Sequence, residues 1–125
     1  MKIVIDLDQT ITAPLDGESY AEKTCNQDVV EKLREYRQKG FSIAIHTARN
    51  MRTHSGNLGL INVHTLPTII DWLDKNNVPY DEVFVGKPWC EEGGFYVDDK
   101  AIRPDEFASM SLEKIYELIG VKAPQ

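Results

Sequence analysis

The chain has 125 residues, of which 42% are hydrophobic and 27% are charged, and its formal net charge is −6 at pH 7. This length predicts one domain with one core over residues 1–125. The acidic balance argues against nucleic acid or an anionic membrane surface as the main partner. The sequence has no apolar run of membrane-spanning length and no CxxC pair, and its first residues lead us to expect no signal peptide. We therefore expect a cytoplasmic protein without membrane contact, whose two cysteines are reduced.

The first predicted element is a short apolar strand over 2–7, of the kind that is buried in a parallel sheet. It carries two carboxylates, Asp6 and Asp8, at or just past its carboxyl end. Residues 12–24 are polar and include a proline and a glycine, which predicts a loop or a small flap hairpin.

Apolar periodicity and end signals then predict alternating helices and strands. The expected elements are a helix capped at Asn26 and ended by Gly40, a strand over 41–45, a segment over 48–64 that starts helical and continues as an irregular loop, a helix from 65 to about 75, strands over 82–85 and 95–97, and a last helix that Ser109 or Ser111 caps and Gly120 ends. Such alternation predicts βαβ units, and therefore an α/β fold with a parallel sheet.

Polar residues gather at the predicted carboxyl ends of the strands, where sheets of this type bind ligands. They are Asp6 and Asp8 after the first strand, Thr47 and Arg49 after the second, Lys87 after the third, and Asp98 and Asp99 after the fourth. Two carboxylates this close repel each other, so keeping both ionised needs a cation, and oxygen ligands favour a hard ion such as Mg²⁺. An aspartate can also form an aspartyl-phosphate. The pattern therefore indicates metal-assisted phosphoryl transfer.

About the first hundred residues resemble the haloacid dehalogenase-like phosphatase superfamily, whose members carry four short motifs at four strand ends. The matching motifs are Asp6-Leu7-Asp8-Gln9-Thr10, the strand ending in Thr47, Lys87 in Val85-Gly86-Lys87-Pro88, and Asp98-Asp99. Segments 46–50, 86–90 and 95–100 further resemble a group of bacterial phosphatases associated with capsular polysaccharide biosynthesis. The resemblance implies a Rossmann-like three-layer sandwich with a central parallel sheet. The intervals between motifs leave no room for a cap domain.

The resemblance also implies roles in catalysis and metal binding. Asp6 would attack phosphorus, and Asp8 would protonate the leaving alcohol and then take a proton from water. Mg²⁺ would be held by Asp6, by the backbone carbonyl of Asp8 and by Asp99. Asp98 would orient metal-bound water.

Two further strand-end residues and several neighbours are implicated in binding the phosphate. Thr47 would donate a hydrogen bond to a phosphoryl oxygen, and Lys87 would neutralise Asp6 and the phosphate. Arg49 suits a phosphate or a carboxylate, but a salt bridge or surface role is equally open. The candidate substrate-binding residues are Thr10, Arg49, Arg52 and Lys100.

The leading hypothesis is a Mg²⁺-dependent phosphatase acting on a sugar-linked or similar small phosphomonoester. Alternatives are a nucleotide or polynucleotide-end phosphatase, a protein phosphatase and, from a different class, a non-catalytic binding module. An open site without a cap makes a homo-oligomer plausible, and residues 50–64 are a candidate lid. His54, His64 and Cys90 fit no zinc-ligand spacing.

Overall fold

The computed structural model describes residues 1–13 and 24–122. Most of the segment expected to form a loop or flap hairpin, 12–24, lies outside the described residues. Its first residue, Thr12, forms an antiparallel bridge with Cys25, which directly follows the segment. The chain divides into two compact units, Met1–Trp89 and Cys90–Gln125, and each is described by itself. The single domain over 1–125 stays a prediction.

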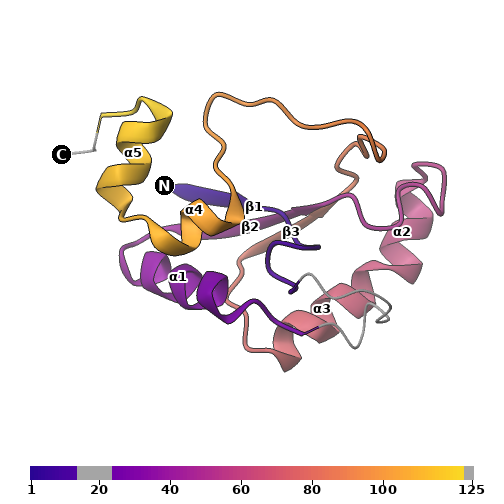
Figure 1. Ribbon diagram of the computed structural model, residues 1–125. Helices are drawn as coiled ribbons and strands as arrows, with labels where there is room; N and C mark the ends of the chain where they lie inside the picture. Colours follow the sequence, from indigo (N-terminus) through magenta and orange to yellow (C-terminus); the bar gives the residue numbers. More distant parts are fainter. Residues whose placement is uncertain (14–23, 123–125) are drawn as a thin grey trace. The chain divides into compact units, whose positions relative to one another are not determined.

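The first unit contains a three-stranded parallel sheet in the order β1-β2-β3 (Figure 1). The strands are β1 (Lys2–Ile5), β2 (Ser42–Thr47) and β3 (Glu82–Val85). Ile5 pairs with Ile45, and Thr47 pairs with Val85. The carboxyl ends of all three strands therefore lie at the same edge of the sheet. The expected α/β fold with a parallel sheet is confirmed.

Among its described residues this unit also contains three helices, whose apolar sides supply about half of its buried hydrophobic side chains. The helices are α1 (Gln27–Gln38), α2 (Leu58–His64) and α3 (Leu66–Lys75). In Figure 1, α1 and α3 lie on the same side of the sheet. The fully buried side chains come from both strands and helices, and include Leu7, Ile11, Leu33, Ile43, Ile45, Ile61, Ile69 and Leu73. Burying a side chain of this size contributes about 1.5–3 kcal/mol.

The segment over 48–64 differs from the sequence prediction. It begins as a series of turns and ends as helix α2, whereas a helical start and an irregular continuation were expected. The physical reason is a cap within the segment: the side-chain oxygen of Asn57 accepts a hydrogen bond from the backbone N–H of Leu60 at 3.1 Å. Such a cap satisfies a donor that the first helical turn leaves free.

The second unit contains two helices among its described residues, α4 (Pro104–Ser109) and α5 (Leu112–Ile119). Ser111 caps α5, and Gly120 ends it in the left-handed conformation, as predicted. The prediction of a strand over 95–97 is wrong: no strand is formed there, and Phe95 and Val97 are 79% and 88% exposed. A strand exists through its ladder of backbone hydrogen bonds, and no strand of the described chain pairs with this segment.

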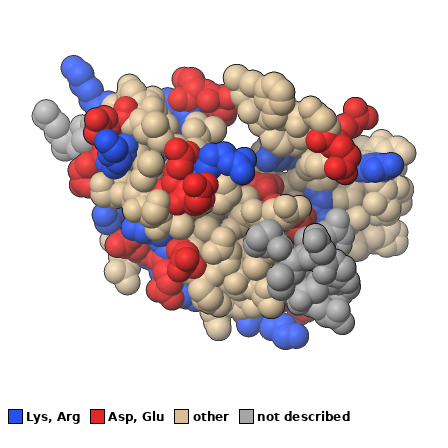
Figure 2. Space-filling view, viewed as in Figure 1, with Lys and Arg blue, Asp and Glu red and all other residues tan. Residues whose placement is uncertain are grey.

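Charged side chains of both signs are interspersed on the face of the molecule seen in Figure 2. Among the described residues, no helix has the length and apolar character needed to cross a membrane.

Candidate active site

A compact turn directly after β1 presents the two N-terminal aspartates. The carbonyl oxygen of Leu7 accepts hydrogen bonds from the backbone N–H groups of Thr10, Ile11 and Thr12, at 3.3, 2.9 and 3.1 Å. Leu7 and Ile11 are fully buried, so the turn is anchored in the core on both sides. Asp6 precedes this anchor and Asp8 follows it, which fixes the backbone from which both carboxylates extend.

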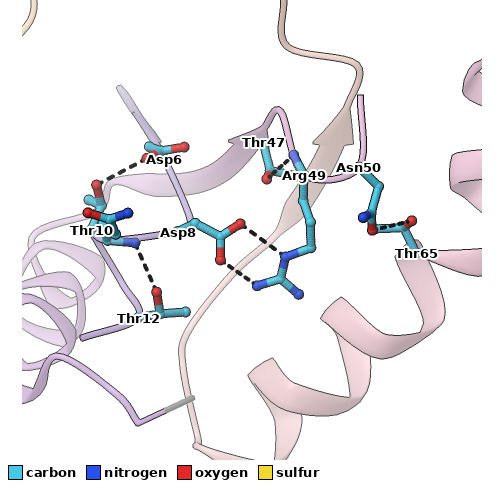
Figure 3. Close-up of polar contacts among 9 residues, drawn as sticks. Asp6, Asp8, Thr10, Thr12, Thr47, Arg49, Asn50 and Thr65 are labelled. Carbon is cyan, nitrogen blue, oxygen red and sulfur yellow. Dashed lines mark hydrogen bonds and ion pairs between the residues drawn. The ribbon is translucent and has the colours of Figure 1, made fainter. Parts of the chain in front are cut away.

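Asp6 lies between a cation and a hydroxyl. One carboxylate oxygen is 3.7 Å from Nζ of Lys87. The other accepts a hydrogen bond of 3.2 Å from the hydroxyl of Thr10, which Figure 3 shows. Burial raises the pKa of Asp6 above its ordinary value. Lys87, the backbone N–H of Leu7 and Thr10 oppose that rise, and the charge of Asp8 adds to it. The positive charge of Lys87 thus offsets part of the effect of burial on the pKa of Asp6.

Lys87 reaches Asp6 from the loop after β3. Its backbone N–H donates to the carbonyl oxygen of Thr47 at 3.1 Å, which continues the pairing of β2 and β3 past the end of the strand. Gly86, directly before it, has φ of +90°. A Cβ on Gly86 would lie 2.6 Å from Cδ2 of Leu58, so helix α2 packs against this loop at a distance that a side chain would prevent.

Asp8 is held by an arginine from the end of the next strand. Nε of Arg49 donates to one oxygen of the Asp8 carboxylate at 3.0 Å, and Nη2 donates to the other at 2.7 Å (Figure 3). The Arg49 side chain is 1% exposed and that of Asp8 is 24% exposed. The ion pair is therefore largely shielded from water, and of the two alternatives that the sequence left open for Arg49, the structure shows the salt bridge.

Thr47 is the last residue of β2 and is 1% exposed. Its hydroxyl oxygen accepts a hydrogen bond of 3.1 Å from the backbone N–H of Arg49. Because this bond uses an acceptor site of the hydroxyl, the hydroxyl hydrogen remains to be donated to another acceptor.

The structure thus brings together Asp6, Asp8, Thr10, Thr47, Arg49 and Lys87, all in the first unit. Arg52 is exposed in the turns that follow β2. Asp98, Asp99 and Lys100 belong to the second unit and are exposed, and the backbone N–H of Lys100 donates to Asp98 at 2.9 Å. Hydrogen bonds from Lys100 and Asp99 lower the pKa of Asp98.

Within residues 1–13 and 24–122, no group of three or more His, Cys, Asp or Glu side chains is placed to hold a metal ion. The rings of His54 and His64 lie with their centroids 5.9 Å apart. The donor chemistry at Asp6 nevertheless fits Mg²⁺, because its carboxylate is a hard oxygen ligand whose side chain is 36% exposed.

Two features of this edge were not predicted from the sequence. Asn50, with φ of +61°, accepts a hydrogen bond of 2.8 Å from the hydroxyl of the buried Thr65. This bond joins the loop after β2 to the start of α3. Burial, followed by the charge of Lys87, lowers the pKa of His46, while Asp6 opposes this change. The first feature could have been suspected from the sequence, because asparagine adopts the left-handed backbone conformation more readily than most residues. The second depends on burial, which the sequence does not specify.

These observations define an α/β protein with an acidic site, flanked by a lysine, at the carboxyl edge of a parallel sheet. The crystal structure of a target protein from Vibrio cholerae matches the chain with a TM-score of 0.90 and 57% sequence identity, over 95% of this chain and 96% of that one. The chain therefore belongs to the same protein family as that Vibrio cholerae protein.

More distant similarity is found in two structures of an RNA repair complex. A chain of a Pnkp1/Rnl/Hen1 complex has a TM-score of 0.51 and 20% identity over 86% of this chain and 34% of that chain. A chain of the Pnkp1/Rnl/Hen1 RNA repair complex has a TM-score of 0.51 and 15% identity over 93% and 31%. At these identities the likeness is one of fold. No family model and no curated protein sequence matches the chain.

Proposed function

We propose that the protein is a Mg²⁺-dependent phosphatase that hydrolyses phosphomonoesters through an aspartyl-phosphate on Asp6. The observation that carries this proposal is the setting of the Asp6 carboxylate, with Lys87 Nζ at 3.7 Å and the Thr10 hydroxyl at 3.2 Å, at the ligand-binding edge of a parallel sheet. The resemblance of the strand-end motifs to haloacid dehalogenase-like phosphatases supports it.

In the first step, a carboxylate oxygen of Asp6 attacks phosphorus in line with the leaving oxygen. The bond between Asp6 and phosphorus forms as the bond from phosphorus to the substrate oxygen breaks. Asp8, which must carry a proton in the reactive state, gives that proton to the departing oxygen, so the alcohol leaves neutral. Phosphorylated Asp6 and ionised Asp8 remain.

In the second step, water attacks the phosphorus of the intermediate. Asp8 takes a proton from this water, the bond between Asp6 and phosphorus breaks, and inorganic phosphate leaves. Both aspartates return to their starting protonation states, so each turnover consumes one water molecule.

The proposed attack needs Lys87 because the Asp6 carboxylate and the substrate phosphate are both negatively charged. A carboxylate that approaches a phosphate dianion meets repulsion of about 4 kcal/mol per pair of unit charges at 4 Å and an effective dielectric constant near 20. Lys87 offsets this repulsion, and the Thr47 hydroxyl offers a hydrogen bond to a phosphoryl oxygen. Mg²⁺ would supply further charge neutralisation when bound. Its proposed ligands are Asp6, the backbone carbonyl of Asp8 and Asp99, with Asp98 orienting metal-bound water.

The proposed substrate is a small, sugar-linked phosphomonoester, and the proposed setting is cytoplasmic capsule polysaccharide biosynthesis. Both rest on the resemblance of segments 46–50, 86–90 and 95–100. The proposal includes a site without a cap domain and a homo-oligomeric protein. The net charge of −6 favours a small substrate over a polynucleotide, whose recognition relies on basic surface.

The test is phosphate release from sugar phosphates, nucleotides, a phosphopeptide, an oligonucleotide with a terminal phosphate and a generic aryl phosphate, with Mg²⁺ and with EDTA. We expect Mg²⁺-dependent release that is greatest for sugar phosphates and is abolished in Asp6→Asn. Faster release from the oligonucleotide or the phosphopeptide would show that the substrate is a polynucleotide end or a phosphoprotein and not a sugar phosphate. Absence of release from all substrates by the folded protein with Mg²⁺ would favour the non-catalytic binding module.

A further inference from the structure

Arg49 contacts both functional strand ends through different atoms. Its guanidinium engages both oxygens of the Asp8 carboxylate, at 3.0 and 2.7 Å, and its backbone N–H donates to the Thr47 hydroxyl at 3.1 Å (Figure 3). Asp8 follows β1 and Thr47 ends β2, so one residue links the two ends. A bidentate pair of this kind fixes the plane of a carboxylate as well as its position.

The burial of Arg49 separates it from the groups that would meet a substrate. Its side chain is 1% exposed, whereas those of Lys87 and Asp6 are 20% and 36% exposed. A phosphate that enters from solvent therefore meets Lys87 and Asp6 before it meets this guanidinium. The carboxylate of Asp8, at 24% exposure, lies between the buried arginine and solvent.

The pair leaves Asp8 able to handle a proton. A carboxylate has about four lone-pair positions, and a two-bond contact uses one on each oxygen. Arg49 therefore restricts rotation of the Asp8 side chain and does not itself occupy all of the lone pairs of that carboxylate. Because proton transfer requires hydrogen-bond reach, the orientation of this carboxylate affects the rate directly.

We propose that Arg49 is a positioning residue, which promotes the reaction by orienting the Asp8 carboxylate and does not bind substrate. This inference deepens the proposed function and rests on it. It predicts that the Arg49 side chain matters most where the leaving group needs a proton. Alkyl phosphates need one, whereas aryl phosphates with an acidic phenol do not.

The experiment compares kcat/KM of the wild type, Arg49→Lys and Arg49→Gln for an alkyl phosphate and for an activated aryl phosphate, since kcat/KM reports the transfer to Asp6. Both variants keep the backbone N–H that donates to Thr47. The matched control is Arg37→Lys. Arg37 also pairs with an aspartate, Asp81, at 2.9 Å, but Asp81 directly precedes β3, at the opposite end from the site.

For Arg49→Lys we expect a fall of about 10- to 100-fold with the alkyl phosphate, within the contribution of a general acid. With the activated aryl phosphate we expect kcat/KM to fall by less than about threefold. When Arg49→Lys is added to Asp8→Asn, we expect no further fall in kcat/KM, since the effect of Arg49 passes through the Asp8 carboxylate. Arg37→Lys should match the wild type. Equal losses for both substrates, or an undiminished loss in the Asp8→Asn background, would overturn the positioning role and assign Arg49 to substrate binding.

Two controls keep the outcomes distinct. If the wild type releases no phosphate from any substrate, the proposed function fails, and the inference fails with it; if the wild type is active, only the pattern in the variants decides. Arg49 is also observable without turnover, through hydrogen exchange of its side-chain Nε–H measured by NMR. We expect that exchange to be slow in the wild type and at least about tenfold faster in Asp8→Asn. Fast exchange in the wild type would overturn the buried pair, even if a variant fails to fold.

Discussion

The ion pair between Asp8 and Arg49 predicts an asymmetric effect on stability. Asp8→Ala would leave the guanidinium of a 1%-exposed side chain without its carboxylate, in a place that water reaches poorly. Removing one partner of a buried pair costs about 3–5 kcal/mol. We expect the lower end, about 3 kcal/mol, because Asp8 is 24% exposed and because its removal also relieves repulsion of Asp6.

Arg49→Met makes the reverse change and should cost less. The methionine keeps much of the buried apolar stem, and the carboxylate left behind is exposed enough to be hydrated. The loss of charge-assisted hydrogen bonds then amounts to about 1–2 kcal/mol. The two costs should not add in the double variant, because the second substitution removes a group that the first has already left unpaired.

Urea unfolding of the four proteins at pH 7 measures these free energies. We expect the free energy of unfolding to fall in the order wild type, Arg49→Met, Asp8→Ala. The loss in the double variant should be smaller than the sum of the two single losses. Equal costs for the two single variants, or strict additivity, would refute the reasoning from burial.

Two further predictions concern the loop after β3 and the opposite end of the sheet. Gly86→Ala should lower the free energy of unfolding by about 2–3 kcal/mol, because alanine at φ of +90° is strained and its Cβ would lie 2.6 Å from Leu58. Thermal unfolding should show a smaller loss when the substitution is made in a Leu58→Ala background. An equal loss in that background would exclude the clash. The backbone N–H of Ile43, followed by Arg37, lowers the pKa of Asp81 below 3.8, so this carboxylate should stabilise the fold above that pH and lose its contribution as the pH falls through the lowered pKa. Unfolding of Asp81→Asn between pH 2 and 7 should show a weaker loss of stability in acid than the wild type, and an identical pH dependence would contradict the assignment.

The fold of the first unit was largely readable from local signals. Asn26 and the apolar spacing in α1, and the proline at the start of α3, place these helices well. Helix α2 was missed because its N-cap, Asn57, stands among turn-forming residues. The strand expected over 95–97 had the right composition, but pairing depends on a partner strand that composition does not reveal.

The site was predictable in its residue types and less so in its contacts. The carboxyl ends of parallel strands meet at one edge, so the proximity of Asp6, Thr47 and Lys87 follows from topology. The bond between Asp8 and Arg49 joins residues 41 positions apart, and an arginine in that place can equally face solvent. Burial decided between the two, and burial is a property of the packed chain.

The most direct test of the account is whether Asp6 becomes phosphorylated. Wild type, Asp6→Asn and Asp8→Asn are mixed with an activated aryl phosphate and Mg²⁺ and quenched in acid, and the intact mass of each protein is measured. Catalysis through Asp6 predicts one added phosphoryl group in Asp8→Asn, located in the peptide that contains Asp6, and none in Asp6→Asn. Rapid turnover by the wild type with no phosphorylated protein in any sample, or a phosphoryl group on another residue, would exclude an intermediate on Asp6.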